Sequence, residues 1–260
     1  MNDPFTTHGI EHLSASSINE FIQNPARWIL KVSGFKDPAG IPAMWRGTAV
    51  DNAITKYLFE RCDLADAKKH ALSIFDEKKK ESESFGAAAD QKKTDKEYYL
   101  LTKYMEAAFD HYKQLPTPVS AQTKISITLD ELPVPIIGYI DLQYDDIVRD
   151  IKTVGRMPSV VPDTTCRQMS VYAHATGCIP VLDYIHVTST KSEVLVRDVP
   201  NVKKHFQTVK QAAMSMMRVL SVSADIQEVA RLYVPDFDDW RWSDVEKEEA
   251  IKLWRLYEET

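Results

Sequence analysis

The feature that most constrains the fold of this chain is a run of strand-like segments that begins after Pro118. Residues 124–129 alternate between polar and apolar side chains, and residues 135–145 and 146–153 are apolar segments that meet at a pair of aspartates. Alternation with a period of two, bounded by turn residues, is typical of consecutive β-strands. We therefore expect a central β-sheet, with a hairpin formed by the last two segments.

Helical patterns flank the predicted sheet. Residues 164–176 have helical spacing, and two further strands are predicted at 181–190 and 192–199. Near the N-terminus, Ser14, Ser16 and Ser17 are candidate helix N-caps, and Ser17 and Glu20 have the spacing of a capping box. Other helices are predicted over residues 13–33, 45–60 and 201–220 and from residue 243. Together these elements predict a mixed α/β domain with a central sheet.

Length and composition favour a single domain. The chain has 260 residues, of which 44% are hydrophobic, so it can bury a core. Residues 61–113 hold eleven acidic and eleven basic side chains without strand-like alternation, which predicts a helical insertion that faces solvent. Residues 226–260 hold ten acidic and five basic side chains and are interpreted as an acidic C-terminal helical segment. We expect residues 1–260 to form one domain that includes both.

The charge of the chain is unevenly distributed. The net charge is −6, yet residues 149–210 hold nine basic and five acidic side chains. Basic groups concentrated on one segment can attract a polyanion even in an acidic protein. The alternative interpretation is a scattered set of solvated charges, and charge alone does not decide between the two.

The sequence argues against several classes of protein. Three cysteines are too few for a disulfide framework or a four-cysteine metal site. No apolar run approaches the roughly 20 residues of a membrane span, and the N-terminus lacks a signal-peptide pattern. Neither a G-x₄-G-K-[ST] nor a G-x-G-x-x-G motif is present, so we expect no nucleotide cofactor. We expect a soluble protein of a reducing compartment, without membrane association.

Charged residues of the predicted hairpin indicate a metal site. Asp141 lies near the end of one strand, and Asp150 and Lys152 near the end of the next. Because side chains alternate along a strand, Asp150 and Lys152 share a face while Ile151 points into the core, and strand pairing brings Asp141 near Asp150. Two carboxylates suit Mg²⁺ or Mn²⁺, and an ammonium can assist hydrolysis of a phosphodiester. For each residue alone, a solvated charge at a strand end is the simpler interpretation.

Four segments resemble, in order along the chain, motifs of the PD-(D/E)XK nuclease superfamily, specifically of its RecB-like exonuclease branch. They are LSASSINEFIQNP from residue 13, RGTAVDNAI from residue 46, GYIDLQYDDIVRDIKT from residue 138 and RQMSVYAHATG from residue 167. The resemblance covers most of the chain outside residues 61–113. It implies a restriction-endonuclease-like α/β core, in which helices flank a central mixed sheet.

The resemblance also implies roles for individual residues of the metal site. Asp141 and Asp150 would bind Mg²⁺ or Mn²⁺, with Asp51 as a further ligand. Ile151, which lies between Asp150 and Lys152, is included with the metal-binding residues. Lys152 would be the catalytic lysine, acting on the attacking water.

Further residues are expected to contact the substrate or the catalytic groups. Gln168 and Tyr172 lie one helical turn apart, and in the family these positions face the active site. The alternative is a partly exposed helix face, with Tyr172 packed on the sheet. The candidate phosphate contacts are Arg46, Arg149, Arg156 and Arg167.

Two positions depart from the motifs. Asp51 stands where many members of the branch have a histidine ligand, although a carboxylate can also bind a hard cation. Asn24 stands where the first motif has a cysteine, and residues 235–250 contain no cysteine. Members with an iron–sulfur cluster need four cysteines, so we expect no iron–sulfur cluster here.

The function implied by the resemblance is hydrolysis of DNA phosphodiester bonds that leaves a 5′-phosphate. An exonuclease acting on DNA ends in recombination, repair or replication is the expected activity. The expected partners are linear single- or double-stranded DNA, a recombination or single-strand-binding protein and further copies of the chain, in the cytoplasm of a bacterial or virus-infected cell. The alternatives are a structure-specific or nicking endonuclease and a non-catalytic DNA-binding module with the same fold.

Overall fold

A six-stranded mixed sheet forms the centre of the protein in a computed structural model, which describes residues 3–36, 40–60, 62–84 and 90–256. The strands are β1 (Leu13–Ser14), β2 (Ser120–Ile127), β3 (Ile136–Gln143), β4 (Ile147–Val154), β5 (Ile179–Val187) and β6 (Ser192–Asp198). Their order is β1-β3-β4-β5-β6, and β2 pairs with β3 outside this path. β1 and β3 are parallel, as are β4 and β5, whereas the β2–β3, β3–β4 and β5–β6 pairs are antiparallel.

One edge of β3 is shared by two strands. Its first two residues pair with β1 and its last two pair with β4, while β2 pairs with both ends of β3 and therefore occupies the opposite edge. The pairing of β3 with β4 ends at Leu142 and Arg149. The two strands thus open into a fork, which we define as residues 138–141 of β3 and 150–153 of β4.

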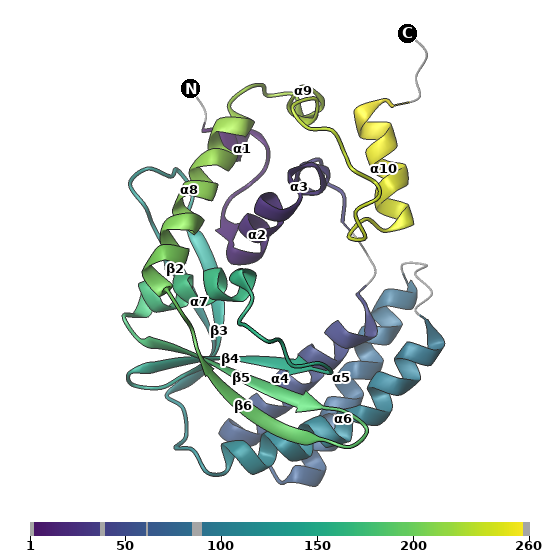
Figure 1. The fold of residues 1–260 in the computed structure, drawn as a ribbon, viewed down its shortest axis with the longest axis vertical. Coiled ribbons are helices and arrows are strands. Elements are labelled where there is room, and N and C mark those ends of the chain that lie inside the picture. The colour runs from purple at the N-terminus through teal and green to yellow at the C-terminus, as the bar shows by residue number, and fades with distance from the viewer. Residues whose placement is uncertain (1–2, 37–39, 61, 85–89, 257–260) are drawn as a thin grey trace.

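Helices cover both faces of the sheet (Figure 1). The helices α4, α5 and α6 lie together against one face, and α2, α7 and α8 pack against the other. The long helices are α2 (Ala15–Gln23), α3 (Pro25–Val32), α4 (Pro42–Glu60), α5 (Leu64–Ser84), α6 (Gln91–Tyr112), α7 (Asp163–Thr176), α8 (Val202–Leu220) and α10 (Asp244–Trp254). Two short helices are α1 (Pro4–Thr7) and α9 (Ile226–Ala230). No helix in the described ranges is both long and apolar enough to cross a membrane.

Side-chain alternation on the central strands divides the apolar residues between two cores. Val148 of β4 and Leu182 of β5 pack in the core beneath α2, α7 and α8. Ile151 and Ile185, from the same two strands, pack in the core beneath α4, α5 and α6. Asp150 lies two residues after Val148 on β4, so its side chain points to the same face of the sheet, the face covered by α7. The alternation that the sequence predicted therefore sets the face on which the charged residues stand.

The predicted α/β fold with a central mixed sheet and flanking helices is confirmed. Helices α5 and α6 lie within the predicted insertion at 61–113, and α9 and α10 within the predicted acidic segment at 226–260. Residues 61 and 85–89 of the first prediction, and 257–260 of the second, lie outside the described residues.

The predicted capping box of Ser17 and Glu20 is wrong. Ser14 is the N-cap of α2, and the hydroxyl groups of Ser14 and Ser17 each accept a hydrogen bond from the other residue's backbone N–H, at 3.1 and 3.0 Å. Glu20 instead forms ion pairs of 2.5 Å with Arg27 and Lys31. The box lies three residues earlier because β1 ends at Ser14, where the backbone is still extended.

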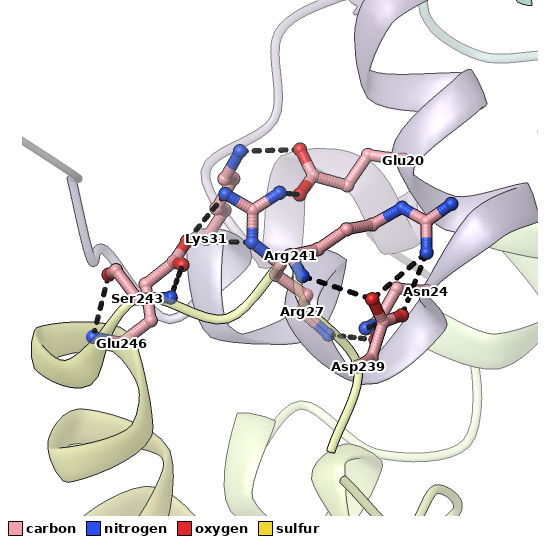
Figure 2. Close-up of polar contacts among 8 residues, drawn as sticks. All are labelled: Glu20, Asn24, Arg27, Lys31, Asp239, Arg241, Ser243 and Glu246. Carbon is pink, nitrogen blue, oxygen red and sulfur yellow. Dashed lines mark hydrogen bonds and ion pairs between the residues drawn. The ribbon is translucent and has the colours of Figure 1, made fainter. Parts of the chain in front are cut away.

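Polar contacts fasten the C-terminal segment to the N-terminal helices (Figure 2). Arg27 bridges Glu20 to the fully buried Glu246 of α10, with an Nη2–Oε1 distance of 2.7 Å to Glu246. Asn24, where the first motif has a cysteine, donates a hydrogen bond of 3.3 Å to Asp239. Asp239 also pairs with Arg241 at 2.9 Å. In the described structure, hydrogen bonds and ion pairs therefore hold these two distant segments together.

Candidate active site

Asp141 and Asp150 lie on the two arms of the fork. Extending the strand register beyond Leu142 and Arg149 places these two aspartates opposite each other. Oδ2 of Asp141 accepts a hydrogen bond of 2.7 Å from the backbone N–H of Ile151. This bond takes the place of strand pairing inside the fork, and it fixes the Asp141 carboxylate beside the strand that carries Asp150.

Lys152 joins the site from the same face of β4. Its Nζ lies 2.7 Å from Oδ2 of Asp150, as an ion pair, and 3.2 Å from Oε1 of Gln168. Nε2 of Gln168 donates to Oδ1 of Asp150 at 3.1 Å and to the Tyr172 hydroxyl at 2.8 Å. The structure thus brings Gln168 and Tyr172 of α7 beside Asp150 and Lys152 of β4, with Tyr172 buried and Gln168 partly exposed.

Gly138 makes room for Tyr172 inside the fork. A Cβ atom on Gly138 would lie 2.7 Å from Cε1 of Tyr172, closer than real Cβ atoms approach a neighbour. Tyr172 is 4% exposed, so its ring has little space to move away. The glycine at this strand position therefore permits the tyrosine ring to pack closely against β3.

Asp51 reaches the fork from α4, on the other side of the site. Burial, and after it the neighbouring charge of Asp150, raise the pKa of Asp51 from 3.8 to about 6. Burial and then the charges of Asp150 and Asp51 also raise the pKa of Asp141 well above its ordinary value. Three mutually repelling carboxylates in a buried site are the electrostatic environment that a divalent cation relieves.

The donors in the fork fit a hard divalent cation that keeps water ligands. Within the described part of the chain, no group of three acidic, histidine or cysteine side chains is arranged so that it could hold a metal ion by itself. Mg²⁺ is commonly held by one or two carboxylates and completes its shell with water and substrate oxygens. Oδ1 of Asp51 is buried and has no hydrogen-bond partner among the described residues, which suits a metal ligand. Ile151 can offer only its main chain to a metal, because its side chain lies in the core beneath α4, α5 and α6.

Lys152 is held in its charged form. Burial by itself lowers the pKa of the Lys152 ammonium, but the charges of Asp150 and Asp141 outweigh burial and raise this pKa above its ordinary value. Burial, followed by the charge of Asp150, likewise raises the pKa of Tyr172, so its hydroxyl stays protonated. At neutral pH the site therefore presents an ammonium and a phenol as hydrogen-bond donors beside the carboxylates.

Three of the four arginines predicted to contact phosphate are bonded to other residues of the protein. Arg46 is 5% exposed; it pairs with Glu97 and donates hydrogen bonds to Oγ1 and O of Thr153 at 3.2 and 3.0 Å. Arg149 points to the opposite face of β4 and pairs with the fully buried Asp183 at 2.7 Å. Each of these two guanidinium groups therefore has an acidic partner within the protein.

The other two arginines differ from each other in exposure. Arg167 is buried in α7 and donates a hydrogen bond of 2.5 Å to Oδ1 of Asn19. Arg156 is exposed, two residues beyond the end of β4. Of the four predicted phosphate contacts, Arg156 alone is exposed, and it lies close to the end of β4.

Two residues of the site were not predicted from the sequence. Gln122 of β2 donates a hydrogen bond of 2.7 Å from Nε2 to Oδ2 of Asp51. Gly138 belongs to the third motif, but nothing in the spacing linked it to Tyr172. A polar residue on a strand opposite Asp141 is the weak signal that could have identified Gln122, and Gly138 carries no comparable signal.

The electrostatic cost at Asp51 leads to a prediction for Asp51→Asn. Because the raised pKa of about 6 belongs to the folded state, ionisation of Asp51 destabilises the fold once the pH exceeds the ordinary value of 3.8, and fully above pH 6. In EDTA at pH 8, we expect the free energy of unfolding of Asp51→Asn to exceed that of wild type by about 1–3 kcal/mol. Urea denaturation at pH 8 and pH 4 measures it, and the gain should vanish at pH 4.

The matched control for this variant is Asp130→Asn, which changes an exposed aspartate outside the site. It should leave the free energy of unfolding unchanged within about 0.5 kcal/mol at both pH values. A loss of stability for Asp51→Asn at pH 8 without metal would contradict the electrostatic account of the site.

The fork with its carboxylates and lysine defines a site suited to metal-dependent hydrolysis of phosphodiesters. The comparison with protein families shows which group the chain joins: residues 12–244 match the model of the PD-(D/E)XK nuclease superfamily, and the chain belongs to this superfamily. Among solved structures, one similar chain is described as "Crystal structure of SSO0001", with 12% identity and a TM-score of 0.33 over 76% of this chain and 86% of that chain. A comparison with curated protein sequences gave no significant match.

Proposed function

We propose that this chain is a metal-dependent DNA exonuclease, which hydrolyses phosphodiester bonds from DNA ends in recombination, repair or replication. The observation that carries the proposal is the joint position of Asp141, Asp150 and Lys152 in the fork. Membership of a nuclease superfamily supports phosphodiester hydrolysis. The preference for ends rests on the resemblance of the four sequence motifs to the RecB-like branch.

The proposed metal is Mg²⁺ or Mn²⁺, held by Asp141, Asp150 and Asp51 with the main chain of Ile151. When bound, such a cation polarises the phosphate and lowers the pKa of a coordinated water. Oδ1 of Asp51 is available for it because no described residue bonds to this atom. Neutralisation of the three carboxylates would also offset their mutual repulsion.

The remaining residues of the site would position and stabilise the reacting phosphate. Lys152, as an ammonium, donates to phosphate oxygens as negative charge develops in the transition state. Gln168 holds both Lys152 and Asp150, and Tyr172 in turn holds Gln168. Arg156 is the proposed contact to a neighbouring phosphate of the strand.

The proposal predicts metal-dependent loss of linear DNA. End-labelled linear and closed circular DNA, single- and double-stranded, would be incubated with Mg²⁺ or Mn²⁺ beside an EDTA control. We expect linear DNA alone to be degraded, and we expect Asp150→Ala to lower the rate at least about 100-fold because it removes a metal ligand. The position of the label in the products reports the strand polarity.

The other outcomes of this assay separate the alternatives. Cleavage of closed circles would replace the exonuclease with a structure-specific or nicking endonuclease acting through the same residues. DNA binding without cleavage of any substrate would favour a non-catalytic DNA-binding module that has the nuclease fold but does not catalyse hydrolysis.

A further inference from the structure

Gln122 joins two parts of the protein that the sheet alone does not connect. It belongs to β2, whereas its hydrogen-bond partner Asp51 belongs to α4, 71 residues earlier in the chain. Its neighbours Ala121 and Thr123 pair with β3, and this register places Gln122 opposite Asp141. One residue therefore lies across the strand from one carboxylate of the site and bonds directly to another.

The backbone of Gln122 is strained at this position. Its φ angle is +49°, in the left-handed region that is unfavourable for residues with a side chain, and it interrupts regular pairing at the third residue of β2. Such conformations persist where the surrounding structure holds them, and they are concentrated at functional sites. Glycine would adopt this angle without strain, whereas this position carries a side chain that forms a specific hydrogen bond.

What the side chain offers is an orientation for Asp51. The Gln122 amide donates to Oδ2 of Asp51 at 2.7 Å, and Oδ1 is left buried without a partner among the described residues. A carboxylate with one oxygen fixed by an amide keeps the other oxygen in a defined place. The bond also removes rotamer freedom that Asp51 would otherwise lose on binding a ligand.

We propose that Gln122 is a positioning residue of the metal site, which holds Oδ2 of Asp51 so that Oδ1 binds the divalent cation. This inference rests on the proposed function, because it requires a cation in the fork. The strained backbone of β2 is then the structural cost of placing the amide beside α4. Gln122 touches neither the cation nor the phosphate and acts through Asp51.

The test is the affinity of the protein for Mn²⁺, measured by titration calorimetry without DNA. Gln122→Ala should weaken Mn²⁺ binding about 10-fold, the lower end of what loss of a group that orients a metal ligand produces. Gln122→Gly should weaken binding equally, yet melt about 3 °C above Gln122→Ala because glycine relieves the strain. The two variants therefore separate the hydrogen bond from the backbone conformation.

A double-variant cycle shows whether Gln122 acts through Asp51. On an Asp51→Asn background, Gln122→Ala should cause no further loss of Mn²⁺ affinity, because the ligand that it positions is already impaired. Asn201→Gly is the matched control: Asn201 also has a left-handed φ, of +52°, but caps α8 outside the site. It should leave Mn²⁺ affinity unchanged.

The wild-type protein distinguishes failure of this inference from failure of the proposed function. If wild type binds Mn²⁺ and cleaves DNA while Gln122→Ala binds Mn²⁺ equally well, the inference alone is overturned. Equal and additive losses on the Asp51→Asn background would overturn it too, since Gln122 would then act independently of Asp51. A wild-type protein that binds no Mn²⁺ would overturn both.

Discussion

Lys152→Ala is expected to lower the rate of DNA hydrolysis by about 10³-fold while leaving DNA binding within about threefold of wild type. The size of the loss follows from what a positioned ammonium contributes, either by proton transfer or by stabilising charge in the transition state. Lys152 is paired with Asp150, bonded to Gln168 and held in its charged form before DNA binds, so we expect it to add little to binding of the ground state. The loss should therefore fall on kcat rather than on KM.

The measurement is single-turnover cleavage of labelled DNA in saturating Mg²⁺, beside a binding titration in Ca²⁺. Metal must be present, because removal of the ammonium leaves the fork carboxylates without their cationic neighbour. Lys191→Ala is the matched control, since Lys191 is an exposed lysine in the turn between β5 and β6. Wild-type turnover by Lys152→Ala would exclude Lys152 from the reaction, and an equal loss of binding would make it a substrate contact instead.

The part of the site that could be predicted from the sequence is the part that local geometry determines. Two apolar strands joined at adjacent aspartates pair as a hairpin, and strand alternation then places Asp150 and Lys152 on one face. Gln168 and Tyr172 share a helix face for the same kind of reason, a spacing of four residues. Each inference needed only the side-chain period of one strand or helix and, for the hairpin, the pairing of that strand with the next.

The arginines show what such reasoning could not reach. Arg149 neighbours Asp150 in the sequence, yet alternation turns it to the opposite face, where Asp183 neutralises it. Arg46 belongs to a motif of the resembled family, but the acid that it pairs with comes from α6, fifty-one residues later. Whether a positive side chain is free for a phosphate depends on such distant acids. The backbone strain at Gln122 is likewise a property of the assembled sheet.

Arg46→Ala is expected to lower the free energy of unfolding by about 3–5 kcal/mol, the range for breaking a buried ion pair from one side. The guanidinium of Arg46 pairs with Glu97, lies 4.6 Å from the ring centre of Tyr104 and donates to the carbonyl oxygen of Thr153. The alanine variant leaves Glu97 without its buried partner and leaves the Thr153 carbonyl without that donor. Urea denaturation in EDTA at pH 7 measures the loss.

Lys68→Ala is the matched control, because Lys68 also joins the helices of this layer but pairs with Glu106 at 2.6 Å near the surface. It should cost less than about 1 kcal/mol. If Arg46→Ala does not fold, Glu97→Gln tests the same contact, since it keeps the shape of the side chain and removes the charge that Arg46 neutralises.

The stability measurement also separates two roles for Arg46 that the family resemblance leaves together. If Arg46 contacts phosphate, its removal would weaken DNA binding and reduce the salt dependence of binding, while the free energy of unfolding would stay nearly unchanged. If Arg46 instead holds α4, α6 and β4 together, its removal would lower the free energy of unfolding in the absence of DNA. Thr153 follows Lys152 directly, so loss of its contact with Arg46 would also let the fork shift. Arg46→Ala should therefore lose activity even where it remains folded. A variant with wild-type stability and weakened DNA binding would restore Arg46 to the phosphate-binding surface.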